Sequence, residues 1–270
     1  MRAQRAMSAQ PAASLLSGAA VLLLLTTPAA ADKLDDILAR GRLVVGVSET
    51  SPPFSARQGE NGVVGYDVDL AARVAQRLGV ALEKISVTNP ERIPALQHDR
   101  VDLVASGMTR AENRKREIAF SLAYLVSPHK VLIRRDSGIA TVTRLRTLAL
   151  VRTASVDAEL KAAVPALQIV HFEDYAACFA ALRDRQVDGF LADEVLLLFF
   201  AQTGGTPQDF GLIADYELPR TAGFGIKRDE PRLKARVDAI LLDLEGSGEA
   251  AKIFATWFAG VPRTFRIVPD

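Results

Sequence analysis

The sequence has 270 residues, of which 49% are hydrophobic and 24% charged, so it can form a large core and is not of the disordered class. Its 33 Lys and Arg against 32 Asp and Glu give a formal net charge of +1, which excludes the basic field that nucleic-acid binding needs. One cysteine and three scattered histidines exclude an internal disulfide and a structural zinc site, and we expect no metal and no cofactor.

Residues 1–31 have the three parts of an export signal. Two arginines give a positive start, an apolar run covers residues 12–25, and three alanines at 29–31 form a cleavage site before Asp32. A membrane anchor fits less well, because the run is shorter than the roughly 20 residues that span a bilayer. No cysteine follows the run to carry a lipid. We therefore predict a cleaved signal peptide and a mature protein in the periplasm.

The mature chain alternates between strand and helix patterns. A short apolar run at 43–47 predicts a buried strand, and apolar residues at spacings of three and four over 67–79 predict an amphipathic helix that ends at a glycine. Residues 117–133 and 217–226 alternate apolar and polar positions, which predicts strands that cross between two lobes. Helical spacing returns over 231–258. This order predicts the α/β class.

One pattern of helix end, polar turn and buried strand occurs twice, 86 residues apart, at 95–105 and 181–192. The pattern is the repeating unit of an α/β sheet with parallel strands, so two copies favour two similar lobes. Gly107 and Asp193 follow the two strands at equivalent places. Open α/β sheets bind their ligands at this edge, so both residues are candidates for a site. Chance similarity between two such units is the alternative.

These segments resemble the periplasmic solute-binding proteins of ABC transporters, and specifically the polar amino-acid-binding group, bacterial extracellular solute-binding protein family 3. The resemblance covers almost the whole mature chain. The matching motifs are Gly41-Arg42-Leu43-Val44-Val45-Gly46-Val47, Pro52-Pro53-Phe54, Gly65-Tyr66-Asp67-Val68-Asp69-Leu70-Ala71, Arg92-Ile93-Pro94-Ala95-Leu96, Gly107-Met108-Thr109, Arg114-Lys115, Phe120-Ser121 with Tyr124, Val187-Asp188 with Asp193, and Trp257-Phe258.

The resemblance implies the type II periplasmic-binding-protein fold, in which two αβ lobes close over a cleft and two hinge strands cross between them. Lobe 1 would comprise residues 33–126 and 223–270, and lobe 2 residues 127–222. The ligand would be a polar amino acid, and the partner an ABC transporter permease in the inner membrane. A monomer that binds no nucleic acid is expected.

Within the family pattern, Arg114 resembles the residue that binds the ligand α-carboxylate through two parallel hydrogen bonds. Thr109 would add a hydroxyl to that carboxylate, and Gly107 would let the backbone approach the ligand closely. Asp193 resembles the carboxylate that binds the α-ammonium from the second lobe. The alternatives are a solvent-exposed role for Arg114, and a helix-capping role for Thr109 and for Asp193.

The side-chain pocket departs from the family pattern. Ser155 stands where the family often has a threonine after glycine, and it would still donate to a carboxylate. Ser51 and Asn89 stand where aromatic residues commonly sandwich the ligand, and Ser48 where an acidic residue often reads a basic ligand. Arg92 is similar to the arginine of acidic-amino-acid binders, which favours a polar or acidic ligand. A surface position at a helix start is the alternative for Arg92.

We expect structural rather than functional roles for the histidines and the cysteine. His98, His129 and His171 have no evident partners, so a core or surface role is expected for each. Cys178 lies on an apolar stripe with Tyr175 and its neighbours, which predicts a buried, inert thiol.

Two other functions on the same fold compete with transport. Some relatives are periplasmic cyclohexadienyl dehydratases, which act on prephenate or arogenate and need a proton donor in the cleft. Those relatives have a glutamate three residues after the position of Asp193, where this chain has Leu196, so we do not expect an enzyme. The third function is that of a sensor, which reports a ligand, or of an accessory protein, which assists a periplasmic dehydrogenase. We expect no kinase or membrane segment to be attached to this chain, which favours transport.

Overall fold

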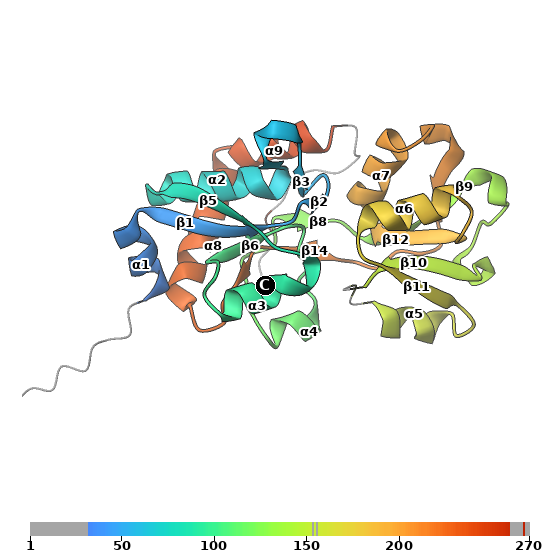
Figure 1. Ribbon diagram of the computed structural model, residues 1–270, viewed down its shortest axis with the longest axis horizontal. Helices are drawn as coiled ribbons and strands as arrows, with labels where there is room; N and C mark the ends of the chain where they lie inside the picture. Colours follow the sequence, from blue (N-terminus) through green and yellow to red (C-terminus); the bar gives the residue numbers. More distant parts are fainter. Residues whose placement is uncertain (1–31, 153, 155, 260–266, 268–270) are drawn as a thin grey trace, which may run out of the picture. The chain divides into compact units, whose positions relative to one another are not determined.

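The computed structural model describes residues 32–152, 154, 156–259 and 267 (Figure 1). The predicted signal peptide, residues 1–31, and the predicted ligand contact Ser155 lie outside the described residues. No helix within these ranges is long and apolar enough to cross a membrane.

The described residues form two five-stranded sheets. The strands of the first are β1 (Arg42–Val47), β5 (Ala81–Ser86), β6 (Leu103–Ala105), β7 (Ala119–Phe120) and β15 (Gly225–Ile226). Their order is β5-β1-β6-β15-β7, with β1 parallel to β5 and β6, and β15 antiparallel to β6 and β7. β1 is buried along all but its first residue, as expected of a central parallel strand covered on both faces.

Helices pack around the first sheet. They are α1 (Lys33–Arg40), α2 (Tyr66–Leu78), α3 (Arg92–Gln97), α4 (Glu112–Lys115), α8 (Pro231–Gly246) and α9 (Glu249–Trp257). α2 contacts β1 and β5 on one side and α8 and α9 on the other (Figure 1). It ends at Gly79, which has the left-handed conformation at φ 73°, so the predicted helix at 67–79 is confirmed with its glycine stop.

The second sheet repeats this plan. Its strands are β9 (His129–Arg134), β10 (Thr147–Val151), β11 (Gln168–Phe172), β12 (Gly189–Asp193) and β13 (Phe210–Leu212), and its helices are α5 (Asp157–Ala163), α6 (Tyr175–Arg183) and α7 (Glu194–Thr203). The order is β11-β10-β12-β9-β13. β10 is parallel to β11 and β12, whereas β9 is antiparallel to β12 and β13.

The internal repeat corresponds to equivalent places in the two sheets. β6 follows α3 and β12 follows α6, and each is the third strand of its sheet, beside the central parallel strand. The sequence predicted parallel sheets, but only three neighbouring strands of each sheet pair in parallel. One strand of each sheet, β15 or β9, runs in the opposite direction and pairs antiparallel with both of its neighbours, because segments that pass between the sheets supply strands to both.

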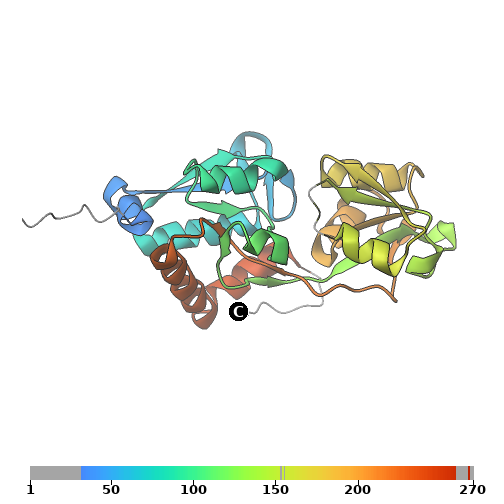
Figure 2. The same cartoon turned by 90° about the horizontal axis from the view of Figure 1, so that it is seen from below.

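The chain passes between the sheets through two short strands, β8 (Leu125–Val126) and β14 (Thr221–Ala222), which pair antiparallel (Figure 2). Both lie in segments that the sequence predicted as crossing strands. A small third sheet, of order β2-β3-β4, packs near α2. Its strands are β2 (Thr50–Ser51), β3 (Ser55–Arg57) and β4 (Val63–Val64); the short 3-10 helices are η1 (Gly59–Asn61), η2 (Asn89–Glu91), η3 (Arg135–Ser137), η4 (Val142–Arg144) and η5 (Pro207–Asp209).

We expect alanine substitution at two glycines, Gly65 at the start of α2 and Gly41 at the end of α1, to differ sharply in its effect on stability. Gly65 has φ +150°, and a Cβ there would lie 2.2 Å from the carbonyl oxygen of Phe54. Gly41 has φ +70° and no atom within 4 Å of such a Cβ. We expect Gly65→Ala to lower the free energy of unfolding by more than about 3 kcal/mol, against about 1 kcal/mol for Gly41→Ala. Urea unfolding measures both, and equal losses would contradict the packing at Phe54.

Candidate functional site

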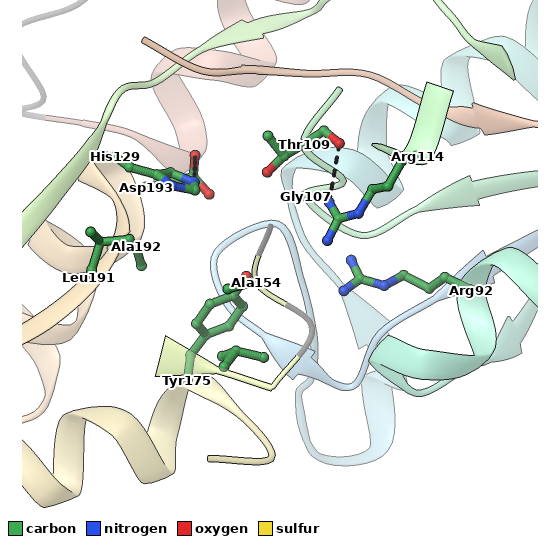
Figure 3. Close-up of a pocket in the computed structure, with 11 residues that line it drawn as sticks. Arg92, Gly107, Thr109, Arg114, His129, Ala154, Tyr175, Leu191, Ala192 and Asp193 are labelled. Carbon is green, nitrogen blue, oxygen red and sulfur yellow. Dashed lines mark hydrogen bonds and ion pairs between the residues drawn. The ribbon is translucent and has the colours of Figure 1, made fainter. Parts of the chain in front are cut away.

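A pocket of about 430 Å³, open solvent included, collects side chains from both sheets (Figure 3). The first sheet and its loops contribute Arg92, Gly107, Thr109 and Arg114, and the second contributes His129, Val151, Ala154, Tyr175, Leu191, Ala192 and Asp193. Five of these were predicted from the sequence as site residues: Arg92, Gly107, Thr109, Arg114 and Asp193.

Arg114 lies on α4, in the loop region after β6. Its Nη1 donates to the carbonyl oxygen of Thr109 at 3.2 Å, which fixes the guanidinium beside the Gly107–Thr109 turn. Burial lowers the pKa of the guanidinium, which still remains protonated at neutral pH. Arg114 therefore lines the pocket as a half-buried cation rather than as a solvent-exposed residue.

Arg92 begins α3 and is only 4% exposed, so it is not a surface residue. Its Nε donates to the carbonyl oxygen of Asn89 at 3.2 Å, and its Nη1 to the carbonyl and hydroxyl oxygens of Ser106, both at 3.3 Å. These partners are neutral. Burial, and then the charge of Arg114, lower the pKa of Arg92 to about 10. The pocket thus holds two neighbouring cations.

A buried carboxylate holds the glycine turn. The Gly107 N–H donates to Asp67 Oδ2 at 2.6 Å, and the Tyr124 hydroxyl donates to the same oxygen at 2.7 Å. Gly107 has φ +63°, and a Cβ there would lie 2.5 Å from the ring of Phe54. Glycine is therefore required both by the backbone conformation and by the close approach of the ring. Burial raises the pKa of Asp67 to about 6.

Asp193 ends β12 and is 6% exposed. It occupies the N-cap position of α7, but its side chain makes no capping hydrogen bond, so the carboxylate stays available to the pocket. Burial raises the pKa of Asp193 to about 7, against a smaller opposite effect of the Arg114 charge. An ammonium group bound there would restore the charged form.

His129 is a pocket residue that sequence reasoning missed. Its Nε2 lies 3.6 Å from Asp193 Oδ1, because β9 pairs with β12 in a register that sets the two residues opposite each other. Burial, and then the charges of Arg220 and Arg114, lower the pKa of His129 to about 3, so the ring is neutral. The proximity of His129 to Asp193 follows from the register between β9 and β12, and a single sequence does not determine that register. The expectation of no partner is also wrong for His171, whose Nε2 lies 2.8 Å from Asp157 Oδ2.

Tyr175 is the second pocket residue, after His129, that was not predicted from the sequence as part of a site. It belongs to the stripe that includes Cys178, and Cys178 is indeed buried, with a pKa raised by burial. Tyr175, however, is the first residue of α6 and lines the pocket. An apolar stripe on a helix does not reveal that one of its members lies at the sheet edge.

Three other predicted residues that the structure describes, Ser48, Ser51 and Asn89, lie outside this pocket. Ser48 and Asn89 line a neighbouring hollow whose rim includes four acidic side chains. Ser51 is buried, and its hydroxyl donates to the Ser48 hydroxyl at 3.0 Å. In the part of the chain that the structure describes, no group of three or more His, Cys, Asp or Glu is arranged to hold a metal ion.

Comparison with known proteins decides the family. The profile of the bacterial extracellular solute-binding proteins, family 3, matches residues 43–260. The chain belongs to this family. Its members share the two-lobed fold in which the resemblance first placed the sequence.

Individual relatives share about a quarter to a third of their residues with the chain. The glutamate/aspartate import solute-binding protein of Escherichia coli is 27% identical over 86% of this chain and 81% of its own length. The glutamine-binding protein of Geobacillus stearothermophilus is 34% identical over 63% and 68%, respectively. The crystal structure of the ancestral amino acid-binding protein AncCDT-1, a precursor of cyclohexadienyl dehydratase, superposes with a TM-score of 0.76 at 28% identity, covering 83% and 99%.

The raised pKa of Asp193 predicts a pH-dependent stability. The carboxyl of Asp193 has a pKa of about 7 in the folded chain, against 3.8 in the unfolded chain. Its ionisation therefore lowers the free energy of unfolding as the pH rises from about 4 to 7. The deficit above pH 7 is of order 4 kcal/mol. We expect Asp193→Asn, without ligand, to be more stable than the unaltered protein at about pH 8, with a smaller difference at about pH 5.

Urea unfolding at both pH values makes this test. Asp35→Asn is the matched control with the opposite sign, because its hydrogen bond from exposed Arg232 lowers the pKa of Asp35. An Asp193→Asn effect of the same size at both pH values would contradict the burial of a chargeable carboxyl.

Proposed function

We propose that this chain is the periplasmic amino-acid-binding component of an ABC importer, released from its leader at residues 1–31 and delivering its ligand to a permease in the inner membrane. The observation that supports it most is a single pocket with Arg114 from one sheet and Asp193 from the other. We assign residues 33–126 and 223–270 to lobe 1 and residues 127–222 to lobe 2.

The backbone of an amino acid matches these two groups. The α-carboxylate binds the Arg114 guanidinium, with the Thr109 hydroxyl as a second donor, and the α-ammonium binds Asp193. Because the two groups belong to different lobes, a ligand that contacts both favours the closed state over the open one. For Ser155, which lies outside the described residues, the resemblance to the family is what supports a role as a further donor.

The charges of the pocket favour an acidic side chain. Arg92 and Arg114 are cations, Asp193 is the acidic lining residue, and His129 is neutral. A ligand with one ammonium and two carboxylates pairs each of the three charged groups. Arg92, whose hydrogen-bond partners are neutral oxygens, takes the second carboxylate. The relative from Escherichia coli that is named for glutamate and aspartate supports the same class of ligand.

The dehydratase alternative has one supporting observation, the likeness to the ancestral precursor of cyclohexadienyl dehydratase. That protein is itself named as an amino acid-binding protein. In this chain Leu196, which stands where dehydratase relatives have a glutamate, is fully buried in the core. A proton donor is therefore missing at that place, and binding without catalysis is the better account.

We expect L-glutamate or L-aspartate to bind the protein purified from the periplasm of an expression host, after unfolding and refolding to remove carried-over ligand. Arg114→Gln should weaken binding of every amino acid by at least about 100-fold, since it removes a charge-assisted pair. Arg92→Gln should weaken glutamate by about 100-fold but glutamine by less than about 10-fold. Arg116→Gln, a nearby exposed arginine, is the control. Isothermal titration calorimetry measures all three.

The same titration separates the alternatives. Binding of prephenate or arogenate in place of any amino acid, followed by turnover, would refute the transport assignment. Binding of neutral or basic amino acids in preference to acidic ones, with Arg114 still required, would refute the acidic ligand and leave the amino-acid assignment intact.

A further inference from the structure

We propose that Tyr175 determines ligand specificity from the second lobe: its hydroxyl donates a hydrogen bond to the distal carboxylate of the ligand that Arg92 binds from the first. This inference rests on the proposed function and adds a residue to its side-chain subsite. The sequence patterns gave Tyr175 no such role.

The position of Tyr175 is well defined by α6. The helix begins at Tyr175, directly after Asp174, whose side chain accepts from the Ala177 N–H at 2.8 Å. One turn further on, Cys178 is buried in the core and anchors the helix. The Tyr175 ring lies 6.5 Å from that of Phe190, on the sheet beneath. The side chain is thus held at the sheet edge and lines the pocket opposite Arg92 (Figure 3).

Tyr175 is half-buried, and among the described residues its hydroxyl makes no hydrogen bond. The charged groups that act on it are Asp193, Arg92 and Arg114. Burial and the carboxylate raise the pKa of Tyr175 more than the two guanidinium groups lower it, so the hydroxyl is a donor at neutral pH. A guanidinium group has donors only and cannot accept this proton.

A ligand carboxylate would supply the acceptor for the hydrogen bond that the Tyr175 hydroxyl can donate. Bound at Arg92, it would keep two lone-pair directions for a further donor, and the hydroxyl faces the same space from the other lobe. A neutral amide in that place offers a weaker acceptor, so the hydrogen bond discriminates glutamate from glutamine. The ring also supplies an aromatic wall, which the family positions occupied here by Ser51 and Asn89 do not.

Tyr175→Phe removes the hydroxyl and keeps the ring. We expect the dissociation constant of L-glutamate to rise 10- to 100-fold and that of L-glutamine less than 3-fold, with unfolding of the ligand-free protein unchanged. Tyr216→Phe is the matched control, because the Tyr216 hydroxyl likewise makes no hydrogen bond among the described residues, but Tyr216 does not line the pocket. It should leave both dissociation constants unaltered.

A double-mutant cycle measures the coupling between Tyr175 and Arg92 in glutamate binding, which a merely structural role of Tyr175 would not produce. If Tyr175 and Arg92 bind one carboxylate, the combined Arg92→Gln and Tyr175→Phe substitutions should weaken glutamate by less than the product of the single effects. Should Tyr175→Phe fail to fold, Tyr175→Leu in the same cycle carries the test, since it removes the hydroxyl with the ring.

Two outcomes overturn the inference and differ in what they imply. Unchanged glutamate affinity in Tyr175→Phe, with affinity still lost in Arg92→Gln, would remove Tyr175 from the subsite and leave the proposed function standing. An unaltered protein that binds no acidic amino acid, but binds another through Arg114, would overturn both the role of Tyr175 and the acidic ligand.

Discussion

Two guanidinium groups and one carboxylate line the same pocket, and the rest of the site depends on this constraint. Burial lowers the pKa of Arg92 to about 10 and raises that of Asp193 to about 7, so each charged form is disfavoured relative to water. A zwitterion that pairs with these groups removes part of that cost. Because its partners lie on separate sheets, the pairing that we propose would also favour a closed state of the two lobes.

The pocket owes its precision to a second buried carboxylate. Asp67, at the start of α2, accepts from the Gly107 N–H and from the Tyr124 hydroxyl, and the Tyr66 hydroxyl donates to the Tyr124 carbonyl at 2.9 Å. This network ties the start of α2, the glycine turn and the segment leading to β8 into one unit. Arg114 is then positioned from the turn itself, through the Thr109 carbonyl.

Much of the fold and the charged part of the site could be predicted from the sequence. Helical spacing and a glycine stop gave α2, and the internal repeat marked Gly107 and Asp193 before any family was considered. His129 and Tyr175 could not be predicted this way. The position of His129 depends on the register between β9 and β12, which is set by packing far along the chain. That of Tyr175 depends on which end of an apolar helix meets the sheet edge, and the pattern of one helix does not contain this information.

We propose that three charged groups of the protein pair with three charged groups of one ligand, and a crystal structure of the refolded protein with L-glutamate is the measurement to make first. We expect the α-carboxylate on Arg114, the ammonium on Asp193 and the distal carboxylate on Arg92. A ligand whose side chain instead turns toward Ser48 and Asn89, without contact to Arg92, would show that this pairing is wrong.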